Sequence, residues 1–140
     1  RELRKDLEAR IRKLEQHARE VRRHAPEVAT RNRDKLLTRI RQADIEIDTS
    51  DDRLLREIAL FADKSDISEE VTRLASHLKQ MGQLLKSDEP AGRSLDFLAQ
   101  EMFREANTMG AKANDTAILR EVMAVKAELE RIREQVQNIE

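Results

Sequence analysis

The sequence predicts an all-α fold, an antiparallel helical bundle whose first and last helices are long and coiled-coil-like. Three observations support this fold class. The 140 residues include only three Gly and two Pro, so few points interrupt regular structure. Charged residues and apolar residues each make up 39% of the chain, a composition typical of helices. Near both ends of the chain, apolar residues recur at alternating spacings of four and three, which is the spacing of a coiled-coil seam.

The first expected helix has an apolar seam that extends over residues 7–28. The seam consists of Leu7, Ile11, Leu14, Ala18, Val21, Ala25 and Val28. Pro26 falls inside this pattern and predicts a kink or a division of the helix, because proline lacks a backbone N–H and clashes with the preceding turn. A second apolar segment follows at residues 36–40. The acidic stretch from Asp44 to Asp52 fits no metal-binding loop spacing, which favours a turn and a helix start at residues 49–52.

Further helices are expected in the rest of the chain. A short helix covers residues 54–62, and a capping-box spacing at residues 66–69 predicts the start of the next one. The loop at residues 87–92 separates that helix from another, which ends near Asn114, and Asp115 is an expected cap of the last helix. The last helix carries a second seam, formed by Ile118, Val122, Val125, Leu129, Ile132, Val136 and Ile139.

Composition limits the possible chemistry and location of the protein. The chain contains no Cys, which excludes disulfides, thiolate metal sites and thiol nucleophiles. No apolar run approaches the roughly 20 residues of a membrane span, and no signal-peptide core is present. We therefore expect a soluble, cytoplasmic protein without membrane contact. The sequence begins with Arg1 rather than Met, and its first residues are already helical in pattern, so we expect a fragment whose N-terminal domain is absent.

Positive charge is concentrated in the N-terminal third of the chain. Residues 1–43 hold 14 Lys and Arg against 7 Asp and Glu, a net charge of +7, and the remaining 97 residues carry −8. The cations that could form a phosphate-binding surface for nucleic acid are Arg10, Arg12, Lys13, Arg19, Arg22, Arg23, Arg31, Arg33, Arg39 and Arg41. The alternative is a solvated helix face with salt bridges between successive turns. No aromatic residues are interleaved to stack bases, which favours the solvated face.

The chain divides into two regions that we expect to form one continuous helical domain. Residues 1–65 are a basic, long helical or coiled-coil region, and residues 66–140 carry the helices with the most distinctive polar residues. The two seam-bearing helices at opposite ends need partners. They pack against each other, against an absent upstream domain or against other copies of the chain, and we expect a homo-oligomer.

The most distinctive polar residues follow the apolar stripe of the helix that ends near residue 114. Glu101, Glu105, Thr108 and Lys112 have the spacing i, i+4, i+7 and i+11, so they stack along one edge of that stripe. Ionisable groups at the border of an apolar stripe have shifted pKa values, and carboxylates there can hold a metal ion. The pattern therefore indicates a functional site.

A second line of polar residues lies on the preceding helix. Glu70 and His77 are seven residues apart, with Arg73 beside them, and a short loop makes the two helices antiparallel neighbours. The residues that we expect to converge as ligands of Mn²⁺ or Mg²⁺ are Glu70, His77, Glu101 and Glu105. The alternative is a buried salt-bridge network in which Arg73, Arg104 and Lys112 neutralise the acids. His17 and His24, in the basic first helix, are expected at the surface.

Several blocks of the C-terminal half are similar to one known family. They read EEVTRLASHL at residues 69–78, GRSLDFL at 92–98, QEMFREANT at 100–108, KA at 112–113 and EQVQNIE at 134–140. In this order they closely resemble the C-terminal half of the bacterial YicC/YloC family, whereas residues 1–65 fit that family with much less specificity. One departure is Ala111, where the resemblance leads us to expect Ser.

The resemblance implies a metal-dependent endoribonuclease that assembles as a hexameric ring and takes part in stress responses and small-RNA turnover. The polar signature carried over by the matched blocks is Glu70, Arg73, His77, Arg93, Asp96, Gln100, Glu101, Arg104, Glu105, Asn107 and Lys112. The residues that would serve catalysis are Glu101, Glu105, His77, Arg73, Arg104 and Lys112. The resemblance covers the C-terminal half of the family only, so it does not predict activity for this fragment alone.

The sequence is compatible with two routes of RNA cleavage. A divalent ion held by the carboxylates would activate water for attack on the phosphodiester, with Arg73, Arg93, Arg104 or Lys112 offsetting the developing charge. Alternatively, the RNA 2′-hydroxyl is the nucleophile and His77 is its general base. The alternative to an enzyme is a non-catalytic helical scaffold that oligomerises and binds RNA or protein.

Overall fold

The computed structural model describes residues 2–43, 50–87 and 91–138. The helices are α1 (Glu2–Gln42), α2 (Asp52–Lys64), α3 (Ser68–Lys86), α4 (Gly92–Ala113) and α5 (Thr116–Gln137). Within these described ranges, every regular element is an α-helix. The predicted all-α class is confirmed, and so are the long first helix and the seam-bearing last helix.

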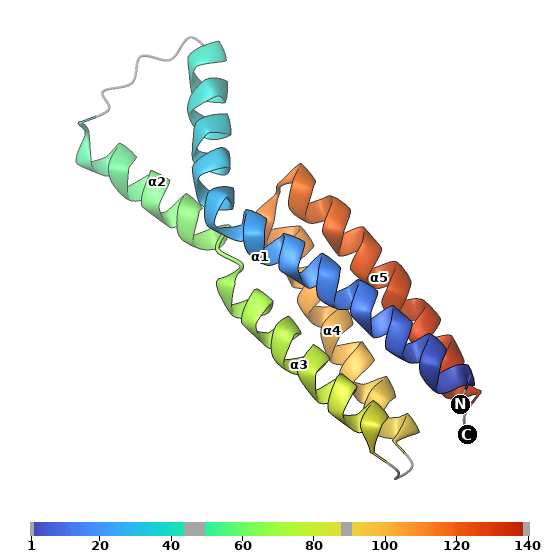
Figure 1. The fold of residues 1–140 in the computed structure, drawn as a ribbon. Helices are drawn as coiled ribbons and strands as arrows, with labels where there is room; N and C mark the ends of the chain where they lie inside the picture. Colours follow the sequence, from blue (N-terminus) through green and yellow to red (C-terminus); the bar gives the residue numbers. More distant parts are fainter. Residues whose placement is uncertain (1, 44–49, 88–90, 139–140) are drawn as a thin grey trace.

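Four of the helices form an antiparallel bundle. The first part of α1 runs against α3 and α5, and α4 runs against the same two helices on the other side (Figure 1). The start of α1 and the end of α5 lie close together at one end of the bundle. The core contains the seam residues of both coiled-coil-like helices, with Leu14, Val21 and Leu129 among the side chains that are fully buried. The two seams therefore pack on each other inside one chain.

Pro26 lies inside a single long helix instead of dividing it. The helix continues from Glu2 to Gln42, and Figure 1 shows it changing direction between its dark blue and light blue parts. The proline is exposed, while Val21 and Val28 on either side of it are buried in the core. A missing backbone hydrogen bond on the solvent side bends the helix without breaking the packed seam. The kink was therefore predicted correctly, and residues 36–40 belong to the same helix.

Helix α2 extends from the bundle as part of an arm. The Asp51 side chain accepts a hydrogen bond of 2.8 Å from the backbone N–H of Arg53, which caps the start of the helix as predicted. Residues 44–49 of the acidic stretch lie outside the described residues. No residue of α2 is buried, and the helix packs mainly on α1.

The starts of α3 and α5 differ in how well the sequence predicted them. Asp115 accepts a hydrogen bond of 3.2 Å from the backbone N–H of Ile118 and caps α5, as expected. At α3, the Asp66 carboxylate instead accepts from the backbone N–H of Ser68, so the capping box predicted at residues 66–69 is not formed as such. The physical reason is the burial of Ile67, which occupies the cap position and is 1% exposed.

His17 corrects one sequence expectation. Its Nδ1 atom lies 2.7 Å from Glu121 Oε2, so the imidazole joins α1 to α5 and is half-buried. The glutamate is on a helix more than 100 residues away in the sequence, which is why helical spacing alone gave no sign of the contact.

Candidate functional site

The predicted site residues gather along the boundary between α3 and α4. We call the set that lies there the polar seam. It consists of Glu70, Arg73 and His77 of α3 and Glu101, Glu105 and Lys112 of α4. The two helices are antiparallel neighbours, as the short loop between them predicted. Because seven residues separate Glu70 from His77 and seven separate Glu105 from Lys112, antiparallel register brings the two lines together.

Glu70 and Lys112 form one end of the polar seam. Lys112 Nζ lies 3.0 Å from Glu70 Oε1, and the Glu70 side chain is 6% exposed. A carboxylate buried to this degree needs a hydrogen-bonded cation to remain charged. The pair therefore fixes α3 against α4 and sets their register.

Four charged groups of the polar seam act on the carboxyl group of Glu105. It is buried, and burial raises the pKa of its carboxyl group above the ordinary glutamate value. The positive charges of His77 and Arg73 act to lower this pKa, while Glu101 and Glu70 act to raise it. Charges from both α3 and α4 thus act on the Glu105 carboxylate.

Two buried polar atoms in the polar seam have no hydrogen-bond partner in the described part of the chain. They are Oε2 of Glu105 and Nδ1 of His77, which lie on facing helices. A buried polar atom without a partner costs about 1–3 kcal/mol, and a ligand, a bound water or an ion is a common reason for it. Further atoms of this kind in the described part of the chain belong to Arg10, Arg31, Asn32 and Gln135. One oxygen and one nitrogen of this kind can receive a proton, a metal ion or a polar group of a substrate.

The remaining acids and cations are engaged with one another or with solvent. Arg104 Nη1 lies 3.7 Å from Glu101 Oε1, and the Arg104 side chain is 78% exposed. Arg73 is exposed and pairs with Glu69, a neighbour that the i, i+4 spacing could have revealed. The salt-bridge alternative therefore describes two of the acids, Glu70 and Glu101, but it leaves Glu105 without an ion pair.

No group of three or more His, Asp or Glu residues in the described ranges is placed so that it could hold a metal ion. Glu70 and Glu101, two of the four predicted ligands, each face a cation instead. The ligand set Glu70, His77, Glu101 and Glu105 stays a prediction.

Other residues of the polar signature serve the packing of α4 against α5. Asp96 Oδ1 accepts a hydrogen bond of 3.0 Å from Arg133 Nε, and Gln100 donates to the same carboxylate. The Arg133 guanidinium also lies over the Phe103 ring, 6.0 Å from its centroid. These contacts lie on the α5 side of α4 and give a structural explanation for Asp96 and Gln100.

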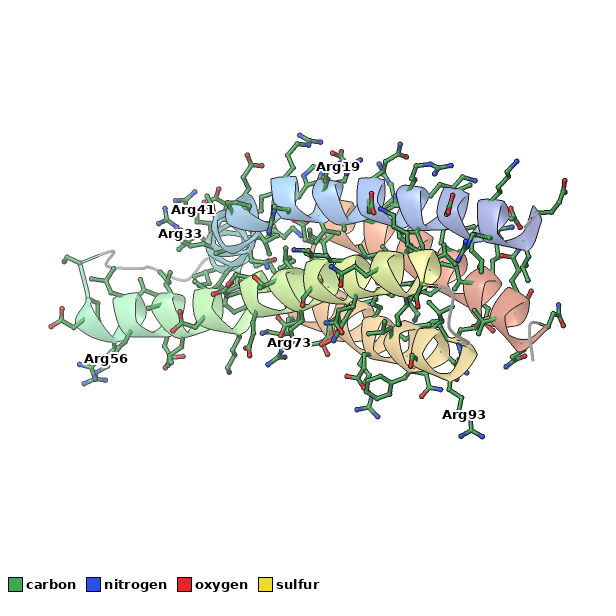
Figure 2. All side chains as sticks on the ribbon, turned by 60° about the horizontal axis from the view of Figure 1, so that its bottom comes forward. Arg19, Arg33, Arg41, Arg56, Arg73 and Arg93 are labelled. Atoms are coloured by element: carbon green, nitrogen blue, oxygen red, sulfur yellow. The ribbon has the colours of Figure 1, made fainter. Side chains whose placement is uncertain are left out.

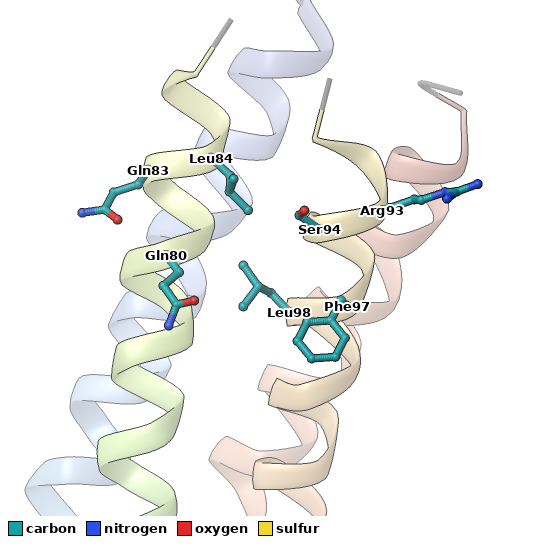
Figure 3. A pocket seen from close by; sticks show the side chains of 7 residues that line it. All are labelled: Gln80, Gln83, Leu84, Arg93, Ser94, Phe97 and Leu98. Atoms are coloured by element: carbon teal, nitrogen blue, oxygen red, sulfur yellow. The ribbon is translucent and has the colours of Figure 1, made fainter. Parts of the chain in front are cut away.

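Arg93 lies far from the polar seam. Figure 2 shows it well separated from Arg73 along the bundle. It lines a pocket of about 560 Å³ between α3 and α4, together with Phe97 and Leu98, and Figure 3 shows its guanidinium pointing away from α3. No residue of the polar seam lines this pocket. Arg93 is therefore unsuited to the charge-offsetting role that the sequence suggested.

Comparison with known proteins decides the family. The family described as endoribonuclease YicC-like, C-terminal, matches residues 21–140. The chain belongs to this family. A relative from Clostridioides difficile (strain 630), named "Probable endoribonuclease YicC", is 42% identical over 139 residues, which cover 99% of this chain and 47% of the relative. A relative of the same name from Haemophilus influenzae is 37% identical over 120 residues, or 86% of this chain and 41% of the relative.

The YicC-like chain spans less than half the length of these curated relatives. The resemblance read from residues 69–140 is confirmed, and the family match extends through α2 into the second half of α1. Among the described residues of this YicC-like chain, no helix has both the length and the apolar character needed to cross a bilayer.

Proposed function

We propose that this chain carries catalytic residues of a metal-dependent endoribonuclease and that the polar seam is where the RNA phosphodiester is cleaved. The names of the relatives support the activity. The observation that carries the location is the pair of buried, unpartnered atoms, Glu105 Oε2 and His77 Nδ1, beside the exposed Arg73. An oxygen and a nitrogen acceptor next to a cation suit a reaction in which a proton moves and a phosphate gains charge.

The donor atoms of the polar seam fit a divalent cation in part. Glu105 and His77 offer an unused oxygen and nitrogen, the ligand types that Mn²⁺ accepts, and Mg²⁺ accepts the oxygen. Glu101 and Glu70 would join them after exchanging their contacts with Arg104 and Lys112 for the ion. When bound, the ion would supply polarisation of the phosphate and a lower pKa of bound water.

The chain's own residues would divide the remaining work. Burial raises the pKa of Glu105, which favours uptake of a proton by this carboxylate. Arg73, whose charge acts on the Glu105 carboxylate, and Lys112, which pairs with Glu70, would offset negative charge that develops on the phosphate. Arg104 is exposed and would contact RNA rather than the reacting atoms.

The nucleophile is either water or the RNA 2′-hydroxyl. With the 2′-hydroxyl as nucleophile, His77 would act as general base through its unpartnered Nδ1 atom. The products distinguish the two routes, since attack by the 2′-hydroxyl leaves a 2′,3′-cyclic phosphate and attack by water does not.

The test is cleavage of an end-labelled RNA by the protein as its host produces it, in Mn²⁺ and in EDTA. Glu105→Gln and His77→Gln are compared with Glu130→Gln, which changes an exposed glutamate on α5. We expect a loss of at least about 100-fold in the first two variants, the usual size of a general acid–base contribution, and no loss in the third. Circular dichroism checks that each variant is folded. Equal cleavage by all folded variants would move the active site out of the polar seam.

A second candidate function is a helical scaffold that assembles and binds RNA or protein without cleaving it. The ion pairs of Glu70 with Lys112 and of Glu101 with Arg104 favour it, because they are what a structural network requires. Under this function, Glu101→Ala lowers the melting temperature and changes no RNA product.

Assembly and location belong to the same proposal. We infer a homo-oligomer, a hexamer by resemblance to the family, that acts in the cytoplasm together with an N-terminal domain of the same protein. The exposed apolar side chains of Leu55, Leu60 and Met123 offer contact surface for other copies. Light scattering on the protein as its host produces it measures the oligomer mass, and a monomer at micromolar concentration would contradict the assembly.

A further inference from the structure

A pocket of about 570 Å³ lies outside the polar seam, where three parts of the chain meet. Its walls come from the last part of α1, from α2 and from the turn between α4 and α5. The lining includes Arg31, Asn32, Lys35, Arg39, Phe61 and Asn114. A volume of this size is in the range of small-ligand sites.

The α1 wall of the pocket is cationic. Arg31, Lys35 and Arg39 are spaced i, i+4 and i+8, so they follow one line of the helix with a rise of about 6 Å per step. Arg33 and Arg41 add two exposed cations nearby, as Figure 2 shows. Asp34, which also lines the pocket, is the only acid from residue 31 to residue 41. This end of α1 therefore attracts anionic ligands.

The same wall is held rigidly against the turn between α4 and α5. The buried Asn32 donates through Nδ2 to the carbonyl oxygen of Ala113 at 2.6 Å, and Arg31 Nε pairs with Asp115 Oδ2 at 2.5 Å. Lys35 Nζ donates to the Asn114 carbonyl oxygen at 3.3 Å. Arg31 thus serves mainly to fix the wall. Lys35 and Arg39 remain the cations of the pocket that are exposed to an incoming anion.

Phe61 of α2 brings an aromatic ring to this cationic wall. The basic region of α1 contains no aromatic residue, and this absence was the reason to favour a solvated face over a nucleic-acid surface. The fold supplies the missing ring from a different helix. An aromatic face beside a line of cations is the combination that binds single strands, because each base can stack and each phosphate can pair.

We propose that this pocket binds single-stranded RNA, with an unpaired base stacked on Phe61 and the neighbouring phosphates on Lys35 and Arg39. The choice of RNA rests on the proposed function. The pocket shares no residue with the polar seam, yet its Asn114 follows Lys112 by only two residues. A strand held here lies close to the end of α4 at which the polar seam begins, so the pocket positions RNA for cleavage without taking part in it.

Binding in EDTA separates this inference from the proposed cleavage. Fluorescence polarisation measures the affinity of the protein, as its host produces it, for a labelled single-stranded RNA of about 12 nucleotides. We expect Phe61→Leu to weaken binding on the order of 10-fold, since it keeps the apolar volume and removes the stacking ring. Lys35→Gln with Arg39→Gln should lower the slope of log affinity against log salt by about 1.4, or about 0.7 per lost phosphate contact.

The matched control is Arg53→Gln with Arg56→Gln, which removes two exposed cations of α2 that do not line the pocket. We expect this variant to bind within about twofold of the unaltered protein, because scattered surface charges are screened by salt. An RNA duplex of the same length should show no dependence on Phe61, because its bases are already stacked in the helix. Circular dichroism of each variant confirms that α2 and the bundle are intact.

The outcomes distinguish the two proposals. Single-stranded binding that is unaffected by Phe61→Leu, or reduced equally by the α2 control, would overturn the pocket whatever happens to cleavage. Weakened binding in the pocket variants together with normal cleavage by Glu105→Gln would retain the pocket and reject the polar seam as active site. A preference for a single-stranded DNA of the same sequence would overturn the assignment to RNA.

Discussion

Lys112 Nζ lies 3.0 Å from Glu70 Oε1, and the two residues are 42 positions apart in the sequence. Glu70 is on the first turn of α3 and Lys112 is on the last turn of α4, so this contact joins the outer ends of an antiparallel helix pair. The carboxylate is also one of the predicted metal ligands. The ion pair therefore stabilises the fold and competes with any cation that enters the polar seam.

We expect Lys112→Met to lower the free energy of unfolding by about 1–3 kcal/mol, because it leaves the buried Glu70 carboxylate without its cation. Chemical denaturation at pH 7 measures the loss. Adding Glu70→Gln to this variant should recover part of it, since the second change removes the uncompensated charge. A double variant that loses the sum of the two single losses would show that the pair is not coupled.

The stability of the protein should depend on pH through Glu105. Burial raises the pKa of this carboxyl in the folded state, so the folded protein holds the proton more tightly than the unfolded chain. Stability from this group is present below the ordinary glutamate pKa and decreases as the pH rises through the higher folded pKa. We expect Glu105→Gln to remove that decrease, measured as the denaturation midpoint from pH 4 to pH 8. An unchanged pH profile would contradict a raised pKa.

Asp115 should act in the opposite direction. Burial tends to raise its pKa, but hydrogen bonds from Arg31 and from the backbone N–H of Ile118 outweigh burial and hold the pKa below the usual aspartate value. The stability that Asp115 contributes is therefore present above the ordinary aspartate pKa, and it is lost as the pH falls towards the lower pKa of the folded state. We expect Asp115→Asn to cost about 1–2 kcal/mol at pH 7 and progressively less in acid. Calorimetry over that range checks the sign.

Gly82→Ala should stabilise α3. A methyl group added at this position would meet no atom within 4 Å apart from its chain neighbours and the backbone of its own helix, and the residue is well inside the helix. Alanine is favoured over glycine in a helix interior by about 0.5–1 kcal/mol, so the midpoint of denaturation should rise accordingly. Cleavage of RNA should be unchanged, because Gly82 does not belong to the polar seam. A lower midpoint would mean that α3 is not helical at this position.

The sequence predicted the bundle well because helical periodicity identifies the buried stripe directly. The seam through Leu14 and Val21 and the seam through Leu129 both became core. It also predicted that the helices of His77 and Glu105 are antiparallel neighbours, since a short loop joins α3 to α4. The convergence of the four predicted ligands stays a prediction. The sequence did not reveal which acids are paired, because a contact such as that of Glu70 with Lys112 depends on side-chain reach across two helices. The position of Phe61 against α1 was hidden for the same reason, and the division at residue 65 stays a prediction.

The absence of buried residues in α2 has a consequence for affinity. A helix that buries no residue gains little free energy when it docks on α1, so the free-energy difference between its docked and undocked states is small. Phe61 faces the cations of α1 only in the docked population. The apparent affinity of the pocket is then the intrinsic affinity multiplied by the docked fraction. Substitutions at those α2 residues that contact α1 can therefore adjust RNA affinity while the melting temperature of the bundle remains the same.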